Sequence, residues 1–164
     1  MSVIVFRGVI ASGIGKHSQL VIPGRSELDS APDDWPEQLC PGSLNVKLHD
    51  DGLPAEFSER CSGELVRKLD SGNFRPEFVI PQSAMQNNKL KPKTDNPNRG
   101  VGQVWRTTLI HSDSGRSAQC WVLRRIGSAL KRQLEIVSHE KIRVEYHLTD
   151  GDEVEAHLNG TWIA

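Results

Sequence analysis

The chain has 164 residues, of which 37% are hydrophobic and 25% are charged, and its formal net charge is −1. This length and composition predict a single domain, residues 1–164, that can bury a hydrophobic core. The near-zero charge argues against nucleic acid and against an anionic membrane surface as partners, because both call for a basic field.

The three cysteines indicate a reducing compartment. Cys40, Cys61 and Cys120 are odd in number and far apart, without a C-x-x-C pair or a zinc-ligand spacing. Residues 1–9 lack the basic start and the cleavage site of a signal peptide, and no apolar run reaches membrane-spanning length. We therefore expect a cytoplasmic protein without a membrane partner, and a monomer.

Residues 3–10 form a β-branched run that predicts a buried first strand. The following turn, Ser12-Gly13-Ile14-Gly15-Lys16, has two glycines in alternate positions, so its backbone N–H groups can approach an anion. A plain hairpin connection to a strand at residues 17–22 is the alternative. Farther on, residues 30–39 predict a short helix with Ser30 as N-cap and with Trp35 and Leu39 facing inward.

Residues 41–48 carry the most informative pattern in the chain. Apolar Leu44, Val46 and Leu48 alternate with polar residues, which is typical of a half-buried strand; the polar residues are Ser43, Asn45 and Lys47. Hydroxyl and carboxamide oxygens are ligands that suit a partly hydrated Mg²⁺, and a lysine beside them suits a phosphate. An ordinary solvated strand face is the alternative.

The middle of the chain predicts one helix, one short strand and one insert. Residues 57–69 place apolar side chains four apart and predict an amphipathic helix, and residues 77–81 predict a strand. Residues 82–100 are rich in Asn, Lys, Pro and Gln, which predicts a mobile surface insert. Its lysines are either solvated or able to order over an anionic ligand.

The pattern in the last third of the chain predicts mainly strands. Residues 101–111 and 117–125 predict a hairpin, and residues 134–137 a further strand in which Glu135 points away from the core. Glu135 is either a solvated carboxylate or one that reaches a substrate hydroxyl. Residues 138–148 fit both a helix and a strand, and the strand at residues 154–158 follows a turn at Asp150-Gly151.

Four blocks, in order, resemble the archaeal CTP-dependent riboflavin kinases. Residues 8–15 resemble that family's strand and glycine-rich turn, and residues 42–48 (G-S-L-N-V-K-L) resemble its G-T-L-N-[LV]-K-L. Residues 134–137 with Ile142-Arg143 resemble its I-E-I-I and L-R elements. Residues 148–154 (L-T-D-G-D-E-V) resemble its L-K-D-G-D-x-[VI].

The resemblance implies a mainly β fold: a small six-stranded cradle-loop barrel with a few short flanking helices, one of them after Ser138. It implies that Ser43 and Asn45 bind Mg²⁺, that Glu135 contacts the flavin side, and that two segments bind the nucleotide. These segments are Ala11, Ser12, Gly13, Ile14, Gly15 and Lys16, and then Glu140, Lys141, Ile142 and Arg143. Ser43 in place of the family's Thr keeps the ligating oxygen.

The chain departs from the family pattern at three places. His17 stands where the family has a third glycine, and Gln19-Leu20 where it has an aromatic residue. Residues 124–128 (R-R-I-G-S) replace a segment that bears Thr and Tyr, and Ser128 is the candidate to supply the lost hydroxyl contact to flavin.

These features together predict a Mg²⁺-dependent phosphotransferase that moves the terminal phosphate of a nucleotide, CTP favoured, to riboflavin and so makes FMN. Such a reaction needs alignment and charge neutralisation more than covalent chemistry, and Glu135 is the candidate catalytic carboxylate. The alternatives are a kinase for another small alcohol, a non-catalytic barrel that binds nucleotide or flavin, and a module that binds a nucleic acid or another partner, although the near-zero charge counts against nucleic acid.

Overall fold

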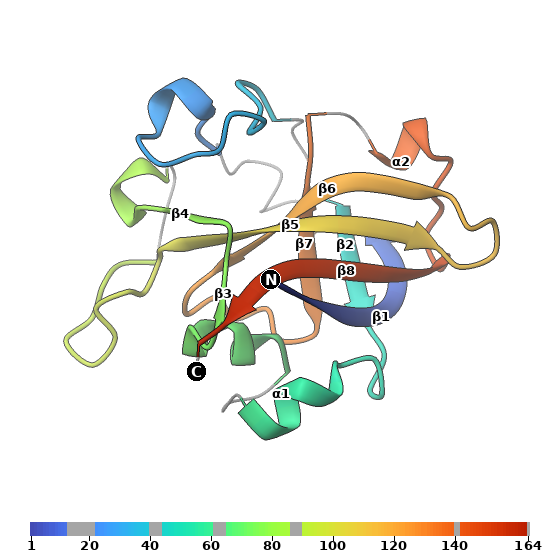
Figure 1. The fold of residues 1–164 in the computed structure, drawn as a ribbon, viewed down its shortest axis with the longest axis horizontal. Helices are drawn as coiled ribbons and strands as arrows, with labels where there is room; N and C mark the ends of the chain where they lie inside the picture. The colour runs from blue at the N-terminus through green and yellow to red at the C-terminus, as the bar shows by residue number, and fades with distance from the viewer. Residues whose placement is uncertain (13–21, 40–43, 61–64, 86–89, 140–141, 164) are drawn as a thin grey trace.

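The computed structural model describes residues 1–12, 22–39, 44–60, 65–85, 90–139 and 142–163. They form a closed barrel of six antiparallel strands with two outer strands and a few short helices, which confirms the predicted mainly β barrel (Figure 1). The barrel strands are β1 (Ser2–Ser12), β2 (Leu44–Leu48), β5 (Gly102–His111), β6 (Ser117–Arg125), β7 (Gln133–Val137) and β8 (Glu153–Trp162).

The barrel closes because β8 pairs with strands on both of its sides. Around the barrel the strands follow the order β1-β2-β7-β6-β5-β8, and β8 pairs with β1. β3 (Phe74–Arg75) adds to β8, and β4 (Phe78–Ile80) adds to β5. Strands β1 and β2 approach so closely at Gly8 that a Cβ there would lie 2.3 Å from the Lys47 carbonyl oxygen.

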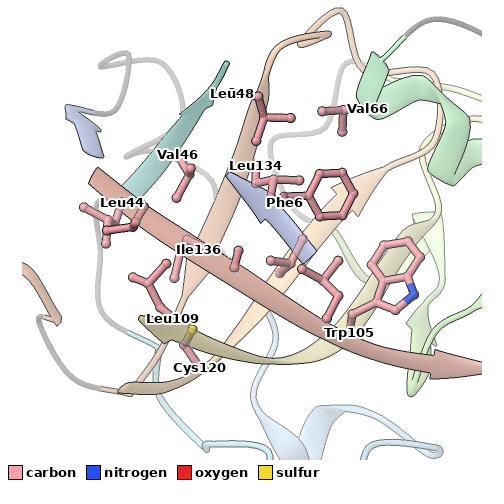
Figure 2. Packing of buried hydrophobic residues seen from close by; sticks show 14 of the residues in the cluster. Phe6, Leu44, Val46, Leu48, Val66, Trp105, Leu109, Cys120, Leu134 and Ile136 are labelled. Atoms are coloured by element: carbon pink, nitrogen blue, oxygen red, sulfur yellow. The ribbon is translucent and has the colours of Figure 1, made fainter. Parts of the chain in front are cut away.

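The inner core fills the barrel with one side-chain set from each strand. Leu44, Val46 and Leu48 of β2 all face it, as their alternation predicts, and Leu134 and Ile136 of β7 lie beside them (Figure 2). Cys120 also lies in this core, where burial raises the pKa of its thiol to about 12. A thiol in that state is inert, as expected of a structural cysteine.

A second, outer core covers the opposite face of the sheet at β4, β5 and β6. Its buried members are Trp35, Phe78, Ile80, Met85, Val104, Trp121, Leu123 and Val137. The 22–39 segment lies over this face, and its Trp35 contacts Phe78 and Trp121 edge to face at centroid distances of 4.9 and 5.2 Å. In Figure 1 this blue segment lies at the top of the view and α1 at the bottom.

Two predicted helices are wrong in form. Residues 30–39 form turns instead of a helix, because Pro36 interrupts them. The short 3-10 helix η1 (Arg25–Glu27) precedes them. Trp35 is buried, as predicted. The expected helix over 57–69 is instead α1 (Ala55–Arg60) and the 3-10 helix η2 (Leu65–Ser71). Leu65 has φ +48°, which no continuous α-helix allows, and Val66 takes the buried place beside Leu69.

The segment before β8 is a helix, α2 (Ile142–Glu145), and the turn that follows it contains His147 with φ +52°. Of the helix and the strand that the sequence pattern allowed for residues 138–148, the structure thus has the helix.

In the 82–100 region, η3 (Gln82–Ala84) is followed by Met85, which packs into the outer core, and Lys91 and Lys93 are exposed. None of the helices in the described ranges is long and apolar enough to cross a membrane.

Candidate functional site

A single row of residues crosses the outer face of the barrel from β1 to β6. Ala11 of β1 lies opposite Asn45 of β2, Asn45 lies opposite Glu135 of β7, and Glu135 lies opposite Leu123 of β6. Directly opposed residues of antiparallel strands point to the same face, with Cβ atoms roughly 5 Å apart. The proposed metal ligand Asn45 and the proposed catalytic carboxylate Glu135 are therefore immediate neighbours.

Asn45 is the most unusual polar residue of this row. Its exposed fraction is 0%, yet neither its Oδ1 nor its Nδ2 has a hydrogen-bond partner in the part of the chain that is described. The alternative drawn from the sequence, an ordinary solvated strand face, is therefore wrong at Asn45, because this side chain is fully buried. A buried carboxamide without partners lowers stability by roughly 1–3 kcal/mol, and such groups call for an explanation.

Arg125 lies near Glu135 on the same face, two residues along β6 from Leu123. Its exposed fraction is 9%, its Nη2 donates to the Gly100 carbonyl oxygen at 3.2 Å, and its Nε has no partner among the described residues. Burial lowers the pKa of Arg125, and the Glu135 carboxylate opposes that shift. The Glu135 carboxylate thus lies close enough to Arg125 to act on it electrostatically.

Gln133 continues the row of polar side chains toward one end of β7. It lies opposite Lys47, which is exposed, and its Oε1 is buried without a partner in the described chain. Together, Asn45, Gln133, Glu135 and Arg125 make a polar strip across β2, β7 and β6. Four of the five unpartnered buried side-chain atoms found in the described ranges belong to this polar strip; the fifth is Gln103 Oε1.

A small pocket opens at the β6–β7 end of the polar strip. It is lined by Arg124, Arg125, Ser128, Gln133 and Glu135, together with apolar residues of β6, β7, η2 and the loop before β7, and it has room for about one water molecule. The pocket thus brings together Ser128 and Glu135, the two residues predicted on the flavin side. An isoalloxazine ring is far larger than this space.

The loop that carries Ser128 is fixed by a buried ion pair. Arg124, with an exposed fraction of 4%, donates through Nε and Nη2 to the Asp70 carboxylate at 3.0 Å each. It also donates to the carbonyl oxygens of Ser128 at 3.0 Å and Leu130 at 2.6 Å. The pocket wall is therefore held by charge-assisted hydrogen bonds between β6 and η2.

The predicted second wall of the nucleotide pocket is described only in part. The side chain of Ile142 packs into the inner core, so it is not presented to a ligand. Arg143 donates to the Asp150 carboxylate at 2.6 Å. Neither residue is among those lining the pocket at Ser128 and Glu135.

Several predicted site residues lie outside the described residues. They are Gly13, Ile14, Gly15, Lys16, Ser43, Glu140 and Lys141. Ser12 ends β1, where its backbone pairs with Leu44. The structure thus describes the barrel side of the proposed site: Ala11, Asn45, Ser128 and Glu135.

The donor set is compatible with Mg²⁺ but not with a metal held by several ionisable side chains. Within the described ranges, no three His, Cys, Asp or Glu side chains gather in a way that could hold a metal ion. A partly hydrated Mg²⁺ requires only one or two oxygens from the protein when phosphates supply others. The unpartnered Asn45 Oδ1 is an oxygen of that kind, so the residues present fit the ion.

Two polar residues of this site were missed by the sequence reasoning, Arg125 and Gln133. Gln133 follows the alternation of Glu135, and this spacing was the available signal.

No protein-family model matches the chain, and no curated protein matches its sequence.

Proposed function

We propose that this protein is a Mg²⁺-dependent phosphotransferase that moves the terminal phosphate of CTP to riboflavin, giving FMN. The observation that carries the proposal is Asn45: a fully buried carboxamide with two unpartnered atoms, directly opposite Glu135. A side chain held in that state is preorganised for a ligand oxygen or cation. Its position in the G-S-L-N-V-K-L stretch is where the resemblance to riboflavin kinases puts a metal ligand.

The reaction balances without further reactants. The primary hydroxyl oxygen of the ribityl chain attacks the γ-phosphorus of CTP, the new P–O bond forms, and the bond from the γ-phosphorus to the β–γ bridging oxygen breaks. CDP leaves with that oxygen, and the hydroxyl proton passes to the Glu135 carboxylate. Glu135 is suited to this because it lies beside the pocket rather than in the inner core.

Asn45 and, by the resemblance, Ser43 would hold the Mg²⁺, whose charge when bound neutralises the phosphates. The chain's own groups supply the remaining alignment. Lys47 lies exposed two residues beyond Asn45, where its ammonium can approach a phosphate. The turn from Ala11 to Lys16 is the candidate for backbone donors to the nucleotide. Positioning of this kind is the main requirement of phosphoryl transfer.

The direct test is to incubate purified protein with riboflavin, Mg²⁺ and either CTP or ATP, and to separate FMN from riboflavin by chromatography. We expect FMN with CTP, and less with ATP. Asn45→Leu should abolish turnover while leaving the protein folded. Val79→Ala, an exposed position on β4, is the matched control and should keep wild-type turnover. Absence of FMN with both donors would refute the proposal.

The size of the pocket favours one alternative, a kinase for a smaller alcohol. The space beside Glu135 admits about one water molecule, which is the size of a hydroxyl group rather than of a ring system. A panel of polyols and nucleosides in the same assay separates this alternative from riboflavin. A barrel that binds nucleotide or flavin without turnover would shift in thermal melting with ligand and yield no product with any acceptor.

A further inference from the structure

The polar strip contains a donor and an acceptor that the proposed metal site does not use. Arg125 Nε carries an N–H and Gln133 Oε1 carries lone pairs, and both atoms are buried without partners in the described chain. Both residues line the same small pocket. An unpaired donor and an unpaired acceptor at one cavity are satisfied together by a group that both accepts and donates.

The size of the pocket selects which group that is. The space holds about one water molecule, and a hydroxyl is the ligand group that matches water in size and in its ability to accept and donate. A carboxylate would satisfy Arg125, but it has no hydrogen to donate to Gln133 and would face Glu135. The composition of the lining therefore favours a neutral hydroxyl.

The side chains that would bind this hydroxyl are held in place. Arg125 is nine-tenths buried and donates through Nη2 to the Gly100 carbonyl oxygen, while the Gly100 N–H donates to the Ile126 carbonyl oxygen at 2.8 Å. The opposite wall is the Ser128 loop, fixed by Arg124 and Asp70. A donor with so little freedom loses little entropy when it binds.

The pocket lies beside Glu135, and this position links it to the proposed reaction. β7 lies between β2 and β6, so Glu135 separates Asn45 from Arg125. A hydroxyl in the pocket would lie on one side of the Glu135 carboxylate, and the metal-binding carboxamide on the other. Glu135 is thus a neighbour of both the candidate hydroxyl site and the candidate metal ligand, which a base for the proposed reaction requires.

We infer that Arg125 and Gln133 form a hydroxyl-binding subsite that recognises the polyol chain of the acceptor, with Arg125 Nε donating to the hydroxyl and Gln133 Oε1 accepting from it. The inference rests on the proposed function for the identity of the acceptor. It assigns the selectivity for the acceptor to the polyol and not to the ring, and one of its two residues, Arg125, lies in the 124–128 segment where the chain departs from the family pattern.

The test compares two flavins that differ only in the polyol. Riboflavin carries the ribityl chain, lumiflavin a methyl group in its place, and both report binding by their own fluorescence without any turnover. We expect wild-type protein to bind riboflavin about tenfold or more tightly than lumiflavin, since a buried partner left unpaired gives an effect of that order. Gln133→Met should lower the preference to about one.

The chain offers a matched control. Gln103 is another buried glutamine with an unpartnered Oε1, but it is not among the residues lining this pocket. Gln103→Met should therefore keep the wild-type preference for riboflavin. Gln133→Asn, which withdraws the carboxamide by one methylene, provides a milder second variant with an intermediate preference, should Gln133→Met fold poorly.

The outcomes separate this inference from the proposed function. A wild-type preference that survives in Gln133→Met, or no binding of riboflavin at all, overturns the subsite. If the melting shift with CTP and Mg²⁺ is intact in that case, the donor half of the proposed function still stands. If the preference behaves as expected but no FMN forms with CTP or ATP, the subsite is supported and the proposed kinase activity fails.

Discussion

The two halves of the outer face of the barrel sheet differ in composition: one is apolar and the other is polar. Over β4, β5 and β6 it is apolar and covered by the 22–39 segment, whose Trp35 has an exposed fraction of 0%. Over β2 and β7 it is the polar strip, with buried atoms that have no partner in the described chain. Asn45 is as fully buried by the protein's own chain as Trp35, but the polar atom of Trp35 has a partner among the described residues and those of Asn45 do not.

The two halves differ in how their buried side chains affect the stability of the fold: those of the apolar half raise it, whereas the unpartnered groups of the polar strip lower it. Burial of Trp35 against two aromatic rings is favourable, and its Nε1 is satisfied by the Pro23 carbonyl oxygen at 3.0 Å. Burial of Asn45 without partners is unfavourable. The proposed function gives this unfavourable group a role, that of a ligand to the bound ion.

The largest expected effect comes from breaking the apolar half. Trp35→Ala should lower the free energy of unfolding by about 3–5 kcal/mol, because it leaves a cavity between Phe78 and Trp121. Urea unfolding followed by circular dichroism measures this change. Val79→Ala, on the exposed side of β4, should change stability by less than about 0.5 kcal/mol. Equal effects of the two variants would contradict the outer core.

The next effect concerns the ion pair that fixes the pocket wall. Asp70→Ala leaves the Arg124 guanidinium buried without its carboxylate and should lower stability by about 3 kcal/mol. The double variant Asp70→Ala/Arg124→Met should recover part of this loss, because the buried charge is removed. Asp29→Ala, at an exposed bend, is the control and should have almost no effect. A double variant less stable than Asp70→Ala would contradict the assignment.

A smaller effect of opposite sign is expected in the polar strip. Asn45→Leu should raise the free energy of unfolding by roughly 1–2 kcal/mol, because an apolar side chain of similar size replaces the unpartnered carboxamide. The same variant should lose the melting shift produced by CTP and Mg²⁺. Differential scanning calorimetry with and without ligand measures both changes. Destabilisation together with a retained ligand shift would count against the site.

The smallest effect is a pH-dependent one at the rim of the apolar half. Hydrogen bonds from Arg106, which also stacks over the Trp121 ring with Cζ 4.5 Å from its centroid, hold the pKa of Asp34 below its ordinary value of 3.8. A carboxylate with a lowered folded-state pKa stabilises the fold above its unfolded pKa, and this contribution is lost as the pH falls through the folded value.

Asp34→Asn should therefore lower stability by less than about 1 kcal/mol at pH 7, since the pair is largely exposed. Its difference from wild type should shrink as the pH falls below 3.8. Urea titrations between pH 2.5 and 7 follow this change. A difference that is constant over the whole range would assign the effect to packing instead of charge.

The sequence predicted the strands well because each buries one face against the inner core. Alternation identified β2 and the β5–β6 hairpin, since most inward residues there are apolar; Thr107 of β5 is a buried exception. It failed over 57–69, where four-residue spacing suggested one helix but Leu65 takes a left-handed conformation. Local spacing does not reveal that a backbone reverses its twist at a single residue.

The candidate site was predictable only in part. Residues 45 and 135 are far apart in sequence, so their direct pairing depends on how the barrel closes, which no local pattern encodes. Arg125 and Gln133 look like ordinary strand polar residues until their burial is known. The burial of these two residues depends on the segments that cover the outer face, and that covering arises from long-range packing.

The most direct test of the central claim is the side-chain amide signal of Asn45 in a ¹⁵N–¹H correlation spectrum, assigned by its absence from Asn45→Leu. We expect CDP and Mg²⁺ together to shift this pair of signals, whereas the side-chain signals of Gln103 stay in place. An Asn45 pair that does not move at saturating CDP and Mg²⁺ would contradict the claim that the polar strip is a ligand site.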